Sequence, residues 1–344
     1  MAISTDVVII GAGPVGLFQV FELGLQNLEC QVVDALPYAG GQCAELYPDK
    51  PIYDIPAIPM CTGLELTNSL LEQIKPFDPT LHFDQTVSVL EKRGEHEFFV
   101  ATEKGLEFHC KAIVIAAGAG SFTPVKLRLD GIDQFEGSQM FYRIRDKTQH
   151  AGKDLIILGG GDSALDWAID LADSAKSITV VNRTERFRAA EASVEKMFAL
   201  EKAGKLKVLL GASSAYEVEN GKLISLTIVL RDEDKTELTL PLDELLVFFG
   251  MSPKLGPIEN WGLELERKLI AIDQTTFETS ETGIYAVGDV STYPGKKKLI
   301  LSGFHEAAMC AFAIKQSLEP DKKINVQYTT TSSELQERLG VNDG

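Results

Sequence analysis

The sequence predicts an α/β fold with two three-layer domains, the second inserted into the first. Three observations support this prediction. A strand, a G-x-G-x-x-G motif and a helical pattern follow one another from residue 7, and a second copy of this pattern begins at residue 155. Near the end of the chain, residues 282–290 form another apolar strand followed by Gly-Asp, which would return the chain to the first domain. We therefore expect two Rossmann-like nucleotide-binding domains. The expected limits are 1–120 and 281–344 for the first domain and 121–280 for the second.

The first glycine motif follows a β-branched apolar run that is typical of a buried parallel strand. Gly11 is expected to make the tight turn, Gly13 to let the backbone approach a pyrophosphate, and Gly16 to bring helix and strand together. The phosphates would bind the free N–H groups at the helix N-terminus. A second strand, 31–33, ends in Asp34, whose carboxylate can accept hydrogen bonds from a ribose. The alternative is a glycine-rich turn in another kind of α/β unit.

The second motif differs from the first at the position that would contact the ribose. It reads Gly159-x-Gly161-x-x-Ala164, and Asn182 stands where the first copy has an aspartate. Three arginines follow: Arg183, Arg186 and Arg188. A carboxylate would repel a 2′-phosphate, whereas arginines pair with one, so this site is predicted to prefer NADPH. A solvated basic turn is the alternative interpretation.

The composition excludes several classes of protein. At 344 residues the chain is long enough for about two domains, and its 44% hydrophobic and 24% charged residues are typical of a globular protein. A net charge of −17 argues against non-specific nucleic-acid binding. No apolar run approaches the ~18 residues of a membrane helix, and Asp6 interrupts the apolar N-terminus. Five cysteines without a C-x-x-C pair fit a reducing compartment, so a cytoplasmic location and no metal site are expected.

In the first domain, the paired glycines 40–41 are expected to let the backbone approach a flat cofactor, and the proline-rich segment after Tyr47 to be non-helical. Apolar residues at helical spacing predict a helix over 63–75. Alternation and intervening Gly turns predict strands at 87–90, 97–100 and 106–108, and a buried strand at 112–118.

In the second domain we expect a helix over 190–203 and strands at 208–210, 223–230, 237–240 and 245–250. A turn-rich segment, 121–137, leads into this domain. After the final Gly-Asp, a helix over 303–318 and a polar tail complete the chain. Asp289 is positioned to bind a polyol, or to cap a helix.

The two motifs and the final G-I-Y-A-V-G-D segment resemble flavoproteins with two dinucleotide-binding domains, of which the low-molecular-weight thioredoxin reductases are the nearest broad group. One difference from the thioredoxin reductases bears on the function. Residues 142–146 read Y-R-I-R-D where those enzymes carry a redox C-x-x-C. Cys43 would begin the C-x-x-x-x-C of larger disulfide reductases, but its partner position is Pro48. Without a dithiol relay, the flavin must pass electrons directly to an acceptor.

The subgroup that matches these features is the thioredoxin-reductase-like ferredoxin (or flavodoxin)–NADP reductases. Their markers here include Gly40-Gly41-Gln42, Leu46-Tyr47-Pro48 and Ser302-Gly303-Phe304. The resemblance implies FAD in the first domain. Its adenosine side would be held by Gly11, Gly13, Pro14, Val15, Gly16 and Asp34, and the remainder lined by Gln42, Val87, Phe122 and Asp289.

The resemblance also implies an aromatic residue on each face of the flavin ring. Tyr47 would stack on one face, and Tyr328 from the partner subunit of a homodimer on the other, with Thr329 and Thr330 near the ring edge. NADP(H) would bind in the second domain, at Gly159, Gly161, Asp162, Ser163, Arg183 and Arg188. Family members usually have two adjacent arginines at the 2′-phosphate; here the second is Thr184.

The implied reaction is hydride exchange between NADPH and FAD, coupled to single-electron transfer to ferredoxin or flavodoxin. No acid–base residue is required. Because such carriers are acidic, we expect a positive docking surface, for which Lys296, Lys297 and Lys298 are the candidates; a solvated turn is the alternative. Two other functions remain open: a flavin-dependent NAD(P)H oxidase or quinone reductase, and a non-catalytic nucleotide sensor.

Overall fold

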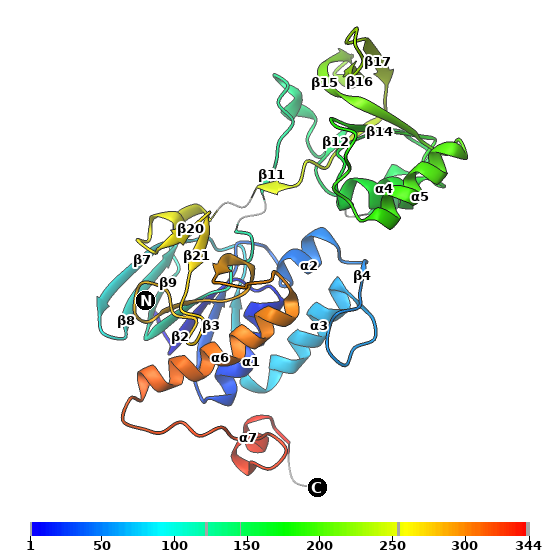
Figure 1. The fold of residues 1–344 in the computed structure, drawn as a ribbon. Coiled ribbons are helices and arrows are strands. Elements are labelled where there is room, and N and C mark those ends of the chain that lie inside the picture. Colours follow the sequence, from blue (N-terminus) through cyan, green and yellow to red (C-terminus); the bar gives the residue numbers. More distant parts are fainter. Residues whose placement is uncertain (1, 121–122, 145, 253–254, 342–344) are drawn as a thin grey trace. The chain divides into compact units, whose positions relative to one another are not determined.

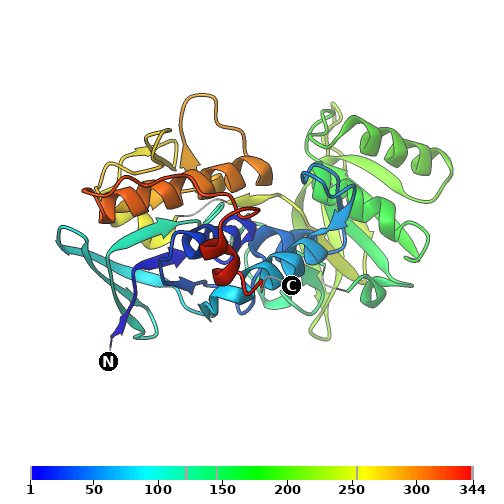
Figure 2. The same cartoon turned by 90° about the horizontal axis from the view of Figure 1, so that it is seen from below.

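A computed structural model describes residues 2–120, 123–144, 146–252 and 255–341. The chain divides into two compact units: Met1–Ser121 with Pro253–Gly344, and Phe122–Ser252. Figures 1 and 2 show the helices and strands of each unit from two directions. In the described part of the chain, no helix is both long and apolar enough to cross a membrane.

The first unit is built on a parallel sheet. Its described strands have the order β22-β10-β2-β3-β6. They are β2 (Val7–Ile10), β3 (Cys30–Val33), β6 (Thr80–His82), β10 (Ala112–Ile115) and β22 (Ile284–Ala286), all paired in parallel. The first glycine motif therefore follows the central strand, as the apolar run predicts.

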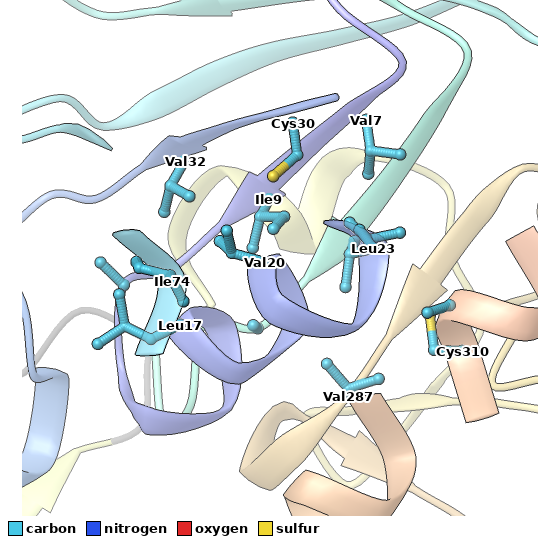
Figure 3. Close-up of a cluster of buried hydrophobic side chains, with 14 of the residues drawn as sticks. Val7, Ile9, Leu17, Val20, Leu23, Cys30, Val32, Ile74, Val287 and Cys310 are labelled. Atoms are coloured by element: carbon cyan, nitrogen blue, oxygen red, sulfur yellow. The ribbon is translucent and has the colours of Figure 1, made fainter. Parts of the chain in front are cut away.

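Three helices cover one face of this sheet: α1 (Pro14–Leu25), α3 (Gly63–Ile74) and α6 (Ile300–Leu318). They lie side by side with α1 in the middle (Figure 1). Figure 3 shows Val7 and Ile9 of the sheet among Leu17, Val20 and Leu23 of α1. Side chains alternate across a strand, so one set of residues meets the helices and the next set meets the opposite layer.

A four-stranded sheet of order β1-β9-β8-β7 covers the other face. Its strands are β1 (Ile3–Ser4), β7 (Val87–Gly94), β8 (Glu97–Thr102) and β9 (Glu107–Cys110). Val8 and Ile10 of the central strand pack here with Phe98 and Phe108. Short pairs complete the unit: β4 (Pro51–Ile52) with β5 (Cys61–Thr62), and β20 (Leu265–Glu266) with β21 (Leu269–Ala271), which also pairs with β23 (Ser291–Thr292).

The chain returns to the first unit before residue 280, which the sequence analysis gives as the end of the second domain. Leu255, Ile258, Leu263 and Ile270 are buried in the same cluster as Val8. The sequence prediction relied on the final strand and the Gly-Asp segment, whereas these scattered apolar residues have no periodic pattern that would assign them to either domain.

The second unit contains a seven-stranded sheet in the described residues, with the order β12-β18-β13-β14-β15-β16-β17. Pairing is parallel from β12 to β15 and antiparallel beyond. The strands are β12 (Met140–Phe141), β13 (Asp154–Leu158), β14 (Ser177–Asn182), β15 (Lys207–Glu219), β16 (Lys222–Leu230), β17 (Glu237–Pro241) and β18 (Glu244–Val247). A separate pair joins β11 (Thr123–Pro124) to β19 (Met251–Ser252). Helices α4 (Asp162–Leu171) and α5 (Glu191–Lys202) cover one face of the large sheet.

Several elements differ from their predictions. A short helix, α2 (Gly41–Leu46), occupies a segment for which only a glycine turn was expected, and β15 extends far beyond the expected 208–210. Helix α6 begins at Ile300, three residues before the predicted start at 303, and the expected polar tail contains α7 (Ser333–Arg338).

Candidate cofactor and nucleotide sites

The glycine loop between β2 and α1 leaves no room for a side chain at Gly11 or Gly16. Gly11 has φ +115°, and a Cβ there would lie 2.4 Å from the Ala116 carbonyl oxygen. A Cβ on Gly16 would lie 1.9 Å from the Gly11 oxygen. Gly13 caps α1 without a side-chain hydrogen bond, and Pro14 follows it. The first turn of α1 therefore presents unpaired N–H groups along an open backbone, which fits a diphosphate.

Asp34 lies at the end of β3 and faces this loop. Its Oδ2 accepts a hydrogen bond from the Ala12 N–H at 2.6 Å, and its Oδ1 accepts one from the Leu36 N–H at 2.7 Å. Burial raises the pKa of Asp34, and the two N–H donors oppose that shift. Each carboxylate oxygen keeps a second lone pair. The geometry therefore fits a ribose hydroxyl beside the glycine loop.

Residues far apart in the sequence meet at α2. Gln42 Nε2 donates to Asp289 Oδ2 at 3.2 Å, and Asp289 lies in a 3₁₀ turn (Gly288–Val290) after β22. Tyr47, half-buried at the end of α2, accepts a hydrogen bond from the Cys43 thiol at 3.5 Å. The amide, carboxylate and aromatic ring expected to line the flavin therefore belong to one unit.

Other predicted cofactor residues have different surroundings. Val87 is buried at the start of β7, within the cluster beneath the central strand. Phe122 lies outside the described residues. Tyr328 is 68% exposed and precedes α7, which is held at the C-terminal end of α1, where Arg338 Nη1 donates to the Leu25 oxygen at 2.5 Å. The glycine loop is at the other end of α1, so Tyr328, Thr329 and Thr330 do not reach the site of their own chain.

The second glycine loop is also closely packed at its first glycine. Gly159 has φ +144°, and a Cβ there would lie 2.3 Å from the Phe248 oxygen. Gly161 caps α4 without a side-chain hydrogen bond and faces open space. The carboxylate of Asp162 accepts a hydrogen bond from the Ala190 N–H at 2.8 Å, and Ser163 is exposed beside it. This loop, like the first, fits a diphosphate.

The arginine-rich turn is tied back to this loop. The Arg188 N–H donates to the Gly160 oxygen at 2.7 Å, and Asn182 Nδ2 donates to the Thr184 oxygen at 2.7 Å. Arg183, Arg186 and Arg188 are exposed, and no carboxylate among the described residues forms a salt bridge with them. The Arg183 guanidinium lies 5.5 Å from the centre of the Phe249 ring. This arrangement fits a bound phosphate.

The expectation that Lys296 belongs to a docking surface is wrong. Its side chain is only 6% exposed and forms an ion pair with the fully buried Glu306. Lys297 and Lys298 are exposed. The sequence analysis missed Glu306, although an acidic residue among the apolar positions of α6 could have indicated it. It also missed the contact of Phe249 with Arg183, which no sequence pattern indicates.

All five cysteines are free thiols and buried. Burial is the largest cause of the raised pKa of both Cys43 and Cys61. The reactive form of cysteine is the thiolate, so these thiols lack the properties of a redox dithiol.

Known proteins resemble this chain in sequence and in fold. The family model for pyridine nucleotide-disulphide oxidoreductases matches residues 5–311. A protein of Cupriavidus taiwanensis named ferredoxin–NADP reductase 2 is 56% identical over 336 residues, which cover 98% of this chain and 90% of that protein. A ferredoxin–NADP reductase of a Polaromonas species is also 56% identical, with coverages of 98% and 93%. Thioredoxin reductases of T. acidophilum and Lactococcus lactis share the fold, with TM-scores of 0.77 and 0.76 at 21% and 24% identity; each comparison covers 92% of this chain and 99% of the other.

Proposed function

Because this chain belongs to the pyridine nucleotide-disulphide oxidoreductase family, we propose that it exchanges electrons between NADPH and a ferredoxin or flavodoxin through bound FAD. The observation that carries this proposal is the pair of diphosphate-binding loops in a chain whose cysteines are buried and unpaired. The chemistry that FAD supplies when bound is two-electron exchange with NADPH and one-electron exchange with a carrier.

The first unit binds and orients the flavin cofactor. The N–H groups of the Gly11–Gly16 loop hold the diphosphate, and Asp34 holds the adenosine ribose. Gln42 and Asp289, already hydrogen-bonded to each other, present an amide and a carboxylate to the polyol. Tyr47 covers one face of the ring. No side chain has to transfer a proton, so we assign no acid–base residue.

The second unit selects the nicotinamide cofactor. The Gly159–Gly161 loop holds its diphosphate, Asp162 and Ser163 flank that loop, and Arg183 with Arg188 binds the 2′-phosphate. Thr184 replaces the second adjacent arginine of the family pattern. Arg188 is tied to the glycine loop through its backbone, which supports a role for it in the same phosphate site.

A homodimer supplies the second aromatic residue. Tyr328, Thr329 and Thr330 precede α7, which is held at the C-terminal end of α1, whereas the glycine loop lies at the N-terminal end of α1. The exposed Tyr328 ring is therefore available to cover the flavin of a partner subunit, where it must move aside for the nicotinamide.

The carrier docks on the exposed surface around Lys297 and Lys298. Leu299 and Leu301 follow directly and are 46% and 45% exposed. A basic patch beside apolar side chains suits an acidic carrier, whose charge would otherwise be repelled by a chain with a net charge of −17. Lys296 does not take part, because it is committed to Glu306.

The test of the proposed function is anaerobic. The purified protein is mixed with NADPH and then with a small ferredoxin, while the flavin absorbance is followed. We expect bleaching by NADPH and recovery with ferredoxin. Bleaching that only oxygen or a quinone reverses would indicate an oxidase or quinone reductase. Protein that binds flavin and is not bleached by NADPH would indicate a nucleotide sensor.

The docking surface has its own test. Lys297→Glu with Lys298→Glu should lower the rate of ferredoxin reduction at least tenfold at low salt, while ferricyanide reduction stays unchanged. The matched control reverses two exposed lysines of the second unit, Lys207 and Lys222, which changes the net charge equally. Equal loss with both acceptors, or an equal effect of the control, would reject the docking surface.

A further inference from the structure

A buried ion pair lies next to the turn that carries Asp289. Glu306, on α6, is fully buried, and Lys296 binds its Oε1. The same Oε1 accepts a hydrogen bond from the Tyr293 hydroxyl at 2.8 Å, and the Lys296 ammonium lies 5.4 Å from the centre of the Tyr293 ring. Two charges removed from water need close partners on all sides, and this pair has them.

The other carboxylate oxygen of Glu306 reaches the turn itself. Its Oε2 accepts a hydrogen bond from the Gly288 N–H at 2.7 Å. The Gly288 carbonyl accepts one from the Ser291 hydroxyl at 2.9 Å, and Gly288 has φ +76°. Both polar groups of the residue before Asp289 are therefore fixed by buried side chains.

The turn also contacts the glycine loop. A Cβ on Gly288 would lie 3.4 Å from Val15, and a Cβ on Gly303 of α6 only 2.3 Å from it. Val15 of the glycine loop is thus enclosed by the turn and by the helix that carries Glu306. A shift of Glu306 would change the position of Asp289 relative to the loop that holds the diphosphate.

We propose that Glu306, with Lys296 as its counter-ion, is a positioning residue that holds the Gly288–Asp289 turn in the conformation that binds the flavin cofactor. The inference rests on the proposed FAD site. Glu306 acts through the Gly288 N–H, and Asp289 makes the contact with the cofactor. The Lys296 ammonium and the Tyr293 hydroxyl hold Oε1 of Glu306, so that its Oε2 stays directed at the Gly288 N–H.

Two double variants separate positioning from simple packing. Lys296→Met with Glu306→Gln keeps a carbonyl oxygen that can accept from Gly288, whereas Lys296→Met with Glu306→Met does not. Both are neutral at this site and similar in volume, so neither leaves an unpaired buried charge. The measurement is the FAD dissociation constant of the full-length, FAD-stripped protein, from fluorescence titration, with circular dichroism and melting curves as folding checks.

We expect the FAD dissociation constant of the Lys296→Met, Glu306→Gln variant to lie within about threefold of the wild-type value. That of the Lys296→Met, Glu306→Met variant should be at least tenfold higher, because the Gly288 N–H loses its acceptor. NADPH affinity should not change. As a control, Lys153→Met with Glu244→Met removes a Lys–Glu pair of the second unit whose glutamate is buried, and it should leave FAD affinity unchanged.

Equal FAD affinities of the two folded variants would overturn the inference. It would also be overturned if the control variant lost as much FAD affinity as the Lys296→Met, Glu306→Met variant. If the Lys296→Met, Glu306→Met variant does not fold, Ser291→Ala removes the side-chain hydrogen bond to the Gly288 oxygen and leaves the one from the Ser291 N–H. This substitution should weaken FAD binding severalfold; unchanged binding would overturn the inference. A wild-type protein that binds no FAD would instead reject the proposed function.

Discussion

Asn182 and Asp34 occupy equivalent positions in two loops of the same design, yet they create opposite electrostatic surroundings. Asp34 accepts two backbone N–H groups and presents a negative charge beside the first loop. Asn182 donates to the Thr184 oxygen and accepts from the Arg183 N–H at 3.0 Å, which shapes a turn that exposes three guanidinium groups. The missing carboxylate and the exposed guanidinium groups together distinguish the proposed phosphate site from the proposed ribose site.

In the proposed site, the preference for NADPH over NADH depends on these arginines. Replacing Arg183 and Arg188 with Ala should raise the dissociation constant for NADPH at least 30-fold and that for NADH less than threefold, because only NADPH loses charge-assisted hydrogen bonds. Titration of each nucleotide measures this. Arg231→Ala with Lys235→Ala, in another exposed turn of the same unit, is the control. Equal losses for the two nucleotides would contradict the assignment.

Glu22 gives the first unit a pH-dependent stability. Burial of this α1 carboxyl raises its pKa from 4.5 to about 7. The folded state therefore binds more protons than the unfolded state between these values, and stability falls as the pH rises through this window. Glu22→Gln should match the wild type near pH 4 and exceed its unfolding free energy by roughly 2 kcal/mol at pH 8.

Urea unfolding at several pH values measures this difference. Glu72→Gln, which changes an exposed carboxylate of α3, is the control and should not remove the slope. A constant difference between wild type and Glu22→Gln at all pH values would show that burial of the charge is not the cause.

At the scale of elements, end signals fix where α3 begins. Thr62 accepts a hydrogen bond from the Glu65 N–H at 3.2 Å, while Glu65 accepts one from the Thr62 N–H at 2.7 Å. This capping box satisfies two N–H groups at the start of α3, which packs on α1. Hydrogen bonds at its N-terminus and its apolar face therefore both determine where α3 forms.

The cap contributes a measurable amount of stability. Thr62→Ala should lower the unfolding free energy by about 1 kcal/mol, because an N–H at the start of α3 loses its acceptor. Thr62→Ser keeps the hydroxyl and should recover most of the loss. Both are measured by urea unfolding, and equal destabilisation by the two substitutions would rule out the cap as the cause.

At the scale of the whole molecule, the proposed shared flavin site depends on where the C-terminal segment lies. Leu335 is buried and Arg338 binds the end of α1, so α7 is held to the first unit while Tyr328 is exposed. In the proposed homodimer this exposed ring quenches the fluorescence of the partner's flavin.

Tyr328→Ala should therefore raise the fluorescence of bound flavin at least twofold without a change in FAD content, because stacked aromatic rings quench flavin emission. Val326→Ala, at another exposed position of the same segment, is the control. Unchanged fluorescence in Tyr328→Ala, or a protein that is monomeric by light scattering, would reject the shared site.

The sequence by itself determined the two nucleotide loops and the elements around them, because their signals are local. Glycines at fixed spacing, apolar runs, alternation and turn residues need no distant partner to be recognised, and strands β2 and β13 with helices α1 and α4 followed from them. Helix α2 was missed because it is a short segment that begins directly after a glycine, and α7 because its anchor, Leu335, is one apolar residue in a polar tail.

Only the tertiary structure decided which residues outside those loops belong together. It showed that Leu255 to Ile270 pack in the first unit, that Gln42 meets Asp289, and that Lys296 is buried against Glu306. These contacts join segments that are far apart in the chain, and nothing in either segment's sequence indicates its partner. A lysine in the sequence looks the same whether its side chain faces solvent or a buried carboxylate. Burial and pairing are properties of the folded chain, so they emerge only when the layers assemble.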